Sequence, residues 1–163
     1  HGMYFWENNL ERAWHWSRLK KRAGTLHNPA VIGAIIDLGY CFDLLDARNI
    51  DLLKKSYDLL NRNLSLLRKE LPENKQHPFN KDKDKDRVLR YLDCAVVENV
   101  HQVMKQEGEK RFDSVRAAFI EGKAIYPQAG FHDKTHIQIC VINPNCIKGF
   151  FRPRNFDKSY PVV

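Results

Sequence analysis

The chain has 163 residues, of which 43% are hydrophobic and 29% are charged. This length suits one domain with a core of its own, and the composition excludes a disordered or fibrous chain. No apolar run approaches the roughly 18 residues of a membrane-spanning helix, and no signal peptide is visible, so we expect no membrane partner. The net charge of +7 favours anionic partners such as nucleotides or RNA, although a generally basic, solvated surface explains it equally well.

The four cysteines form no CxxC pair, and three of them lie in apolar runs. This pattern indicates free thiols in a reducing compartment, and we expect a cytoplasmic protein. His132 and His136 are four residues apart, which leaves a metal site open as the weaker alternative. They flank an expected turn and lack the tight ligand spacing of zinc sites, so we predict no metal.

The first elements in the chain are a short aromatic strand end at residues 1–6 and a helix. Asn8 is expected to cap this helix, with Glu11 three positions later as in a capping box. Basic residues at 20–22 suit its last turn, and Gly24 ends it.

Residues 31–38 are almost continuously apolar, which predicts a buried strand covered on both faces. Leucine and other apolar residues then recur every three to four positions, which predicts a helix from about 50 to 71 that Pro72 ends. Asp46 or Asn49 is the expected cap. This leucine stripe packs on the core or on a second copy, and core packing is the favoured reading.

The second half begins with a charged segment at 73–86, which we interpret as a solvated loop because it lacks the glycine and closing glutamate of a calcium loop. A helix is predicted at 87–104 and a strand at 114–120. The alternating segment 136–142 predicts a central strand, and 146–151 a short last strand.

The element order is therefore strand, helix, strand, helix, helix and then strands, which is typical of the α+β class. The standard phosphate-loop, dinucleotide-loop, hydrolase and zinc-protease motifs are absent from the sequence.

Two segments resemble the ADP-ribosyltransferase superfamily, in particular its PARP-like and bacterial toxin-like branches. The first is the run Gly-Met-Tyr-Phe-Trp-Glu-Asn from Gly2, followed by a helix with small and aromatic residues that include Trp14. The second is Thr-His-Ile-Gln-Ile at 135–139. The resemblance implies that the Tyr4 ring stacks on the nicotinamide of NAD, with Gly2 and Trp14 also at the cofactor.

The same resemblance implies catalytic roles for Gln138 and Glu121. Gln138 stands where the superfamily usually has a glutamate, whose charge stabilises an oxocarbenium-like state. Glu121 is the nearest candidate for a compensating carboxylate, although an exposed turn residue is the alternative reading. The implied fold is a single domain over 1–163, with a split-sheet core that lacks its N-terminal strand or strands and carries a helical insertion at about 46–110.

Three functions are compatible with the sequence. The first is an NAD-dependent ADP-ribosyltransferase that acts on a protein or on DNA or RNA, in a toxin or phage-defence setting with an antitoxin-like partner. The second is a non-catalytic nucleotide- or RNA-binding module of the same fold, and the third is a partner-binding protein that uses the leucine stripe. The anion contacts of the second would be Lys20, Lys21, Arg22, Arg152 and Arg154.

Overall fold

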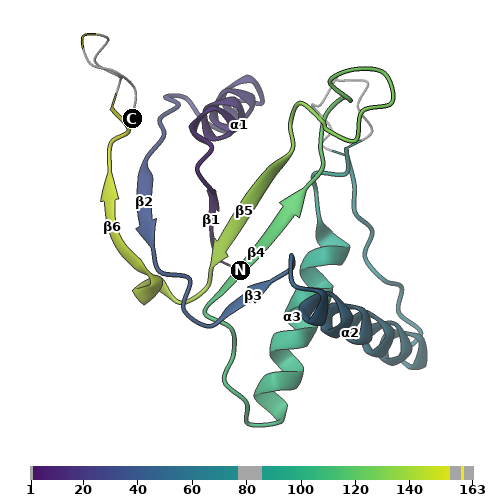
Figure 1. Ribbon diagram of the computed structural model, residues 1–163. Helices are drawn as coiled ribbons and strands as arrows, with labels where there is room; N and C mark the ends of the chain where they lie inside the picture. Colours follow the sequence, from purple (N-terminus) through teal and green to yellow (C-terminus); the bar gives the residue numbers. More distant parts are fainter. Residues whose placement is uncertain (1, 77–85, 155–158, 160–163) are drawn as a thin grey trace.

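A computed structural model describes residues 2–76, 86–154 and 159 of the chain. Two sheets and three α-helices make up the described part, so the predicted α+β class is confirmed (Figure 1). In chain order the elements are β1 (Met3–Trp6), α1 (Leu10–Arg22), β2 (Gly33–Ile36), β3 (Cys41–Asp43), α2 (Ala47–Leu66), α3 (Tyr91–Gln106), β4 (Ser114–Phe119), β5 (His136–Val141), a 3₁₀ turn η1 (Pro144–Cys146) and β6 (Ile147–Phe151).

The larger sheet has the strand order β1-β5-β4-β3, and the smaller sheet pairs β2 with β6. All pairs are antiparallel except β3 with β4, which are joined through α2 and α3 and run parallel. The strand predicted at 136–142 is central, as expected, since β5 has β1 on one side and β4 on the other. The larger sheet stands between the β2–β6 pair and the two long helices α2 and α3 (Figure 1).

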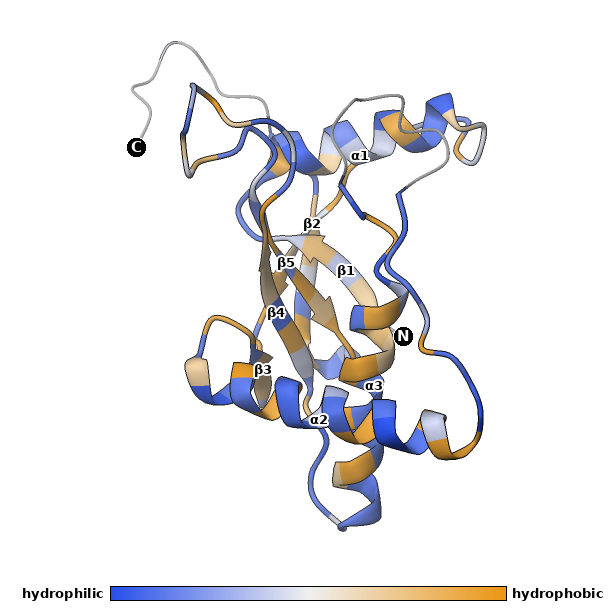
Figure 2. Cartoon of the chain, turned by 90° about the vertical axis from the view of Figure 1, so that its right-hand side faces the viewer, coloured by the Kyte–Doolittle hydropathy of each residue, from blue (hydrophilic) through white to orange (hydrophobic). Residues whose placement is uncertain are grey.

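Successive side chains of β5 point to opposite faces of the sheet and contribute to two separate hydrophobic cores. Ile139 and Val141 face the smaller sheet and cluster with Cys146, while Cys140 between them contacts the other core. That second core lies against α3 and contains Phe42, Val100, Phe112 and Val115. In Figure 2 the apolar strands lie between α1 on one side and α2 and α3 on the other.

The helix ends differ in detail from the predicted ones. Asn9, not Asn8, caps α1, because its side chain accepts a hydrogen bond from the Arg12 backbone N–H (3.1 Å) while Asn8 adopts a left-handed φ of 47°. Asp46 caps α2, as one of the two predicted choices. The helix ends at Leu66 rather than at 71, since Arg68 is also in the left-handed region (φ 52°).

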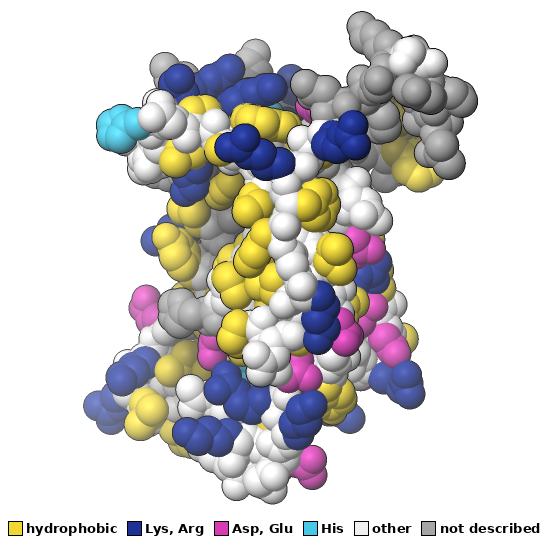
Figure 3. All heavy atoms as spheres, turned by 90° about the vertical axis from the view of Figure 1, so that its left-hand side faces the viewer, with side chains coloured by type: hydrophobic (Ala, Val, Ile, Leu, Met, Phe, Trp, Pro, Cys, Tyr) yellow, Lys and Arg dark blue, Asp and Glu magenta, His cyan; other side chains and the backbone are white. Residues whose placement is uncertain are grey.

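The prediction of a strand buried on both faces at 31–38 is wrong. Only Gly33–Ile36 form β2, and this strand belongs to a two-stranded sheet that leaves Ile35 62% exposed. Ile32 and the β6 residues Phe150 and Phe151 are also exposed, so hydrophobic side chains gather on this face between groups of Lys and Arg (Figure 3). The short strand β3 was not expected from the sequence at all.

The two long helices are joined by a buried polar contact as well as by apolar packing. The Ser56 hydroxyl donates to the Val96 carbonyl oxygen (3.1 Å), and the Asn99 amide donates back to the Ser56 hydroxyl (2.9 Å). Because buried polar groups without partners are costly, these bonds set the register of α2 on α3. The two helices lie within the predicted insertion at 46–110, whose status as an insertion stays a prediction.

Most of the predicted charged loop, residues 77–85, lies outside the described residues. Within the described ranges, no helix is long and apolar enough to cross a membrane.

Asp113, at the start of β4, connects three segments. Its carboxylate accepts hydrogen bonds from the Tyr40 backbone N–H (2.9 Å), the Asn143 side-chain amide (2.8 Å) and the Lys110 ammonium group (3.1 Å). These donors, the Asn143 amide above all, lower the pKa of Asp113 to about 2. The approaches to β3 and the end of β5 are therefore held by one ionised side chain.

We predict that Asp113→Asn lowers the melting temperature at pH 7 and that this difference shrinks in acid. The folded-state pKa is below the unfolded value of about 3.9, so the stabilisation is present above roughly pH 4 and is lost as the pH falls towards 2. The difference in melting temperature between the wild type and Asp113→Asn is measured by circular dichroism during thermal unfolding at several pH values between 7 and about 2.5. Asp58→Asn, on the exposed side of α2, is the control, and an Asp113→Asn effect of equal size at pH 3 and pH 7 would contradict the assignment.

Candidate functional site

Pairing of β1 with β5 brings together the two segments that resemble ADP-ribosyltransferases. In the antiparallel register Tyr4 is opposite Cys140 and Trp6 is opposite Gln138. Directly opposed side chains in such a pair lie on the same face of the sheet. Tyr4, Trp6 and Gln138 therefore share the face that looks towards α3, although about 130 residues separate the two strands in the sequence.

A cavity of about 450 Å³ lies between this face and α3. Tyr4 and Gln138 both line it, together with Cys94, Arg90 and apolar side chains of α2, α3 and β4. The residue Tyr4 is 54% exposed, but its hydroxyl is next to the Cys94 and Cys140 thiols, and desolvation there raises its pKa. The cavity is thus largely apolar with a few polar groups, as ligand sites commonly are.

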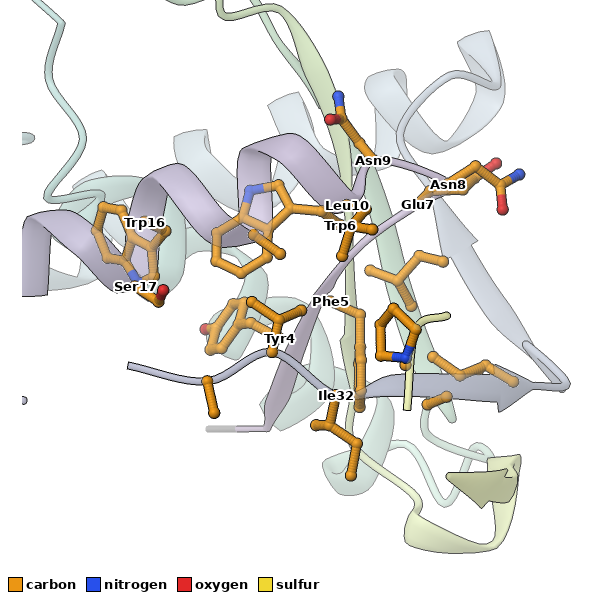
Figure 4. Close-up of a pocket in the computed structure, with 18 of the residues that line it drawn as sticks. Tyr4, Phe5, Trp6, Glu7, Asn8, Asn9, Leu10, Trp16, Ser17 and Ile32 are labelled. Carbon is orange, nitrogen blue, oxygen red and sulfur yellow. The ribbon is translucent and has the colours of Figure 1, made fainter. Parts of the chain in front are cut away.

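A second cavity, of about 770 Å³, lies on the other side of β1 between α1 and the segment leading into β2. Figure 4 shows Tyr4, Phe5 and Trp6 of β1 around it, with Trp16 on α1 and Ile32 on the opposite wall. Tyr4 is the residue that lines both cavities. Each volume is in the range of small-molecule and cofactor sites.

A third, much smaller space of about 50 Å³ contains the predicted catalytic pair. Gln138 and Glu121 both line it, with Arg12, Arg90 and Trp6. Glu121 is 7% exposed, and its two oxygens accept from Arg12 Nη2 (2.9 Å) and Arg90 Nη2 (3.4 Å). Glu121 is therefore not the exposed turn residue of the alternative reading. It is close to Gln138, but both of its oxygens are engaged by guanidinium groups.

The predicted cofactor residues Gly2 and Trp14 have other surroundings. A Cβ on Gly2 would be 2.5 Å from the Val141 carbonyl oxygen and 2.6 Å from Cys140 Sγ, so its missing side chain serves the close approach of β1 to β5. The Trp14 ring lies beneath the Arg18 guanidinium (5.8 Å) and is not among the residues that line these three cavities.

Trp16 lies at the cavity side of α1 instead. Its ring is 6.1 Å from that of Trp6, and the Lys20 ammonium group is 5.0 Å from its centroid. Ala13, Trp16 and Lys20 line the second cavity together because residues three and four apart share one helix face. Leu10 and Trp14 fit the same helical spacing, so the sequence alone does not select Trp16 over Trp14.

Sequence reasoning also missed an ion-pair network that fixes the end of β1. Arg116 on β4 makes a two-point contact with Glu7 (Nε to Oε2 2.6 Å, Nη2 to Oε1 3.0 Å) and a further bond to Asp43 (3.1 Å). The Glu7 contact, above all, raises the pKa of Arg116. No local pattern predicts this pairing, because Glu7 and Arg116 meet only through the shared neighbour β5.

The two histidines weighed as metal ligands are held by backbone groups. His132 Nδ1 is 3.1 Å from the Gly122 carbonyl oxygen, and His136 Nδ1 is 2.7 Å from that of Lys134. Burial lowers the pKa of His136. No cluster of three or more His, Cys, Asp or Glu side chains able to hold a metal occurs in the part of the chain that the structure describes.

No protein-family model, curated protein or solved structure matches the chain.

We predict that Gly2→Ala destabilises the fold, because the new methyl group meets the Val141 carbonyl oxygen and the Cys140 sulfur. Overpacking of this kind costs about 1–3 kcal/mol, which corresponds to a melting temperature lower by about 2–12 °C in a chain of this length. Gly130→Ala is the matched control, since a Cβ at that position meets nothing within 4 Å. Equal melting temperatures for the two variants would show that β1 does not pack on β5 this closely.

Proposed function

We propose that this chain is an NAD-dependent ADP-ribosyltransferase, which binds NAD beside Tyr4 and Gln138 and transfers ADP-ribose to a nucleic-acid or protein acceptor. The observation that carries the proposal is the β1–β5 register. It places an aromatic ring and a carboxamide from two distant segments on one face, in the wall of one cavity.

The position of Tyr4 suits a platform for the nicotinamide ring. The residue is 54% exposed and lines both cavities, so in this proposal a flat ligand stacks on its ring while the rest of the dinucleotide extends into the larger space. The apolar lining of both cavities favours an aromatic ligand, and Lys20 beside Trp16 supplies a cation at the wall of the larger one.

The reaction breaks the bond between the ribose C1′ and the nicotinamide nitrogen, and the electron pair leaves with nicotinamide. The nucleophile of the acceptor then bonds to C1′ and releases its proton to water. In this scheme the Gln138 carboxamide oxygen accepts a hydrogen bond from a ribose hydroxyl and faces the developing positive charge. Glu121 positions Arg12 and Arg90 beside Gln138, because both of its oxygens are held by those guanidinium groups.

A neutral amide stabilises positive charge less well than a carboxylate at the same position. Replacing Gln138 with glutamate therefore tests the electrostatic part of the proposal separately from the binding part. The toxin or defence setting and an antitoxin-like partner follow from the resemblance alone and stay predictions.

The second candidate, a nucleotide- or RNA-binding module, is favoured by the basic end of α1. Lys20, Lys21 and Arg22 occupy its last turn, and Lys20 lines the larger cavity together with Pro153, which Arg152 and Arg154 flank. Binding through such groups weakens steeply as salt is raised.

We predict that the purified chain releases nicotinamide from NAD and that Tyr4→Ala lowers the rate at least about tenfold, since the stacking platform is lost. Tyr126→Ala, which removes an exposed tyrosine outside the three cavities, is the control. Nicotinamide release is measured by chromatography with RNA, with a cell lysate and with neither. The addition that stimulates release indicates the class of acceptor. Unchanged release by Tyr4→Ala would refute the assigned site.

Gln138→Ala is expected to lower nicotinamide release about a hundredfold, in line with the removal of one group that faces charge in a transition state. Gln138→Glu is expected to raise it above the wild-type rate. Absence of release and of NAD binding by calorimetry, together with salt-sensitive RNA binding that Lys21→Gln weakens, would favour the binding module instead.

A further inference from the structure

Three side chains around the smallest cavity carry buried N–H groups that have no acceptor among the described residues. These groups are the indole Nε1 of Trp6 and the guanidinium Nε of Arg12 and Arg90. Buried donors without partners cost about 1–3 kcal/mol each, so most native structures satisfy them with protein, water or ligand. Three such donors around a single space of about 50 Å³ indicate a site for an acceptor-rich ligand.

The charge of the site favours an anion. The two guanidinium groups of Arg12 and Arg90 share one buried carboxylate, that of Glu121, through contacts of 2.9 and 3.4 Å. His136, stacked on Phe119 behind this cluster, adds no charge near neutral pH, because burial lowers its pKa. Asp93, on the outer side of Arg90, makes a long contact of 3.6 Å from a half-exposed position, where solvent screens it.

The size and arrangement of the donors narrow the class of anion. The space of about 50 Å³ is too small for a base or a dinucleotide and admits only a group of a few heavy atoms. The donors come from three separate segments, namely β1, α1 and the residue just before α3. Such a spread suits a tetrahedral group with three or more acceptor oxygens better than a flat carboxylate with two.

Gln138 lines the same space and adds an amide that can donate. The Arg90 guanidinium is also fixed from behind, 4.9 Å from the centroid of the Phe119 ring. The wall of the cavity is therefore built from side chains that are already held by other contacts, and it borders the 450 Å³ cavity through the shared residues Arg90, Phe119 and Gln138.

We propose that this cavity, formed by Trp6, Arg12, Arg90 and Gln138, is a binding site for a phosphate group. The bound phosphate accepts hydrogen bonds from the indole and the two guanidinium groups and balances the excess positive charge of the arginine pair. The site shares Gln138 with the proposed NAD site, but phosphate binding does not depend on the consumption of NAD. Its ligand is either free phosphate or the terminal phosphate of a phosphorylated sugar or nucleotide.

The test is calorimetric titration of the full chain with inorganic phosphate and with ribose 5-phosphate, at constant ionic strength set with sodium chloride. Trp6→Phe removes one N–H and keeps an aromatic ring, and Arg90→Lys keeps the charge and removes the Nε donor. Each is expected to weaken phosphate binding about tenfold or more, as the loss of a hydrogen bond to a charged group implies. Arg48→Gln, which removes an exposed cation of α2, is the matched control and is expected to bind as the wild type does.

Tighter binding of ribose 5-phosphate than of inorganic phosphate would assign the site to a phosphorylated metabolite or nucleotide end, and equal or weaker binding would assign it to free phosphate. Circular dichroism checks that each variant is folded. Absence of phosphate binding by the wild-type chain, or wild-type affinity in both Trp6→Phe and Arg90→Lys, would overturn the proposal. Nicotinamide release measured on the same samples keeps this result separate from the proposed transferase activity.

Discussion

Strand β5 is the element on which the rest of this structure depends. It pairs with β1 along one edge and with β4 along the other, and its two faces contribute to two different cores. Val141 is 1% exposed, while the neighbouring Cys140 faces α3. A strand in this position satisfies its backbone hydrogen bonds on both edges and buries side chains on both faces. Both the split into two sheets and the location of the cavities follow from it.

Polar contacts then fix the ends of the elements that β5 brings together. Arg116 holds the end of β1 through Glu7 and β3 through Asp43, and Asp113, just before β4, holds Tyr40 and Asn143. On the other face, Glu121 holds the arginine pair beside Gln138. These contacts involve ionised groups that are partly or largely buried, which makes them stronger than surface pairs and costly to break singly. They place the candidate site at the meeting point of β1, α1 and α3.

The candidate site was predictable from the sequence only in part. Tyr4 and Gln138 were named because their segments resemble a known superfamily, and the register explains why they meet. Glu121 was expected near Gln138 and lies there, but no sequence pattern showed that Arg12 and Arg90 would hold both of its oxygens. The resemblance implies Trp14 at the cofactor, while the Trp16 ring is the one beside Trp6, because the packing of α1 determines which aromatic ring faces β1. The ion pair between Arg116 and Glu7 joins residues that are 109 positions apart, so no local sequence pattern predicts it.

Local patterns in the sequence determined the type and order of most elements, because hydrophobic periodicity and capping act over a few residues. The helices α1, α2 and α3 and the strands β4, β5 and β6 follow from them to within a few residues, and so does the α+β class. Only the tertiary structure decided which strands are neighbours. Pairing with β6 alone leaves β2 in an exposed two-stranded sheet, and pairing with β4 is what makes residues 41–43 the strand β3. Strand pairing and side-chain burial depend on contacts between distant segments, and such contacts decide where the cavities, the arginine pair and the two cores lie.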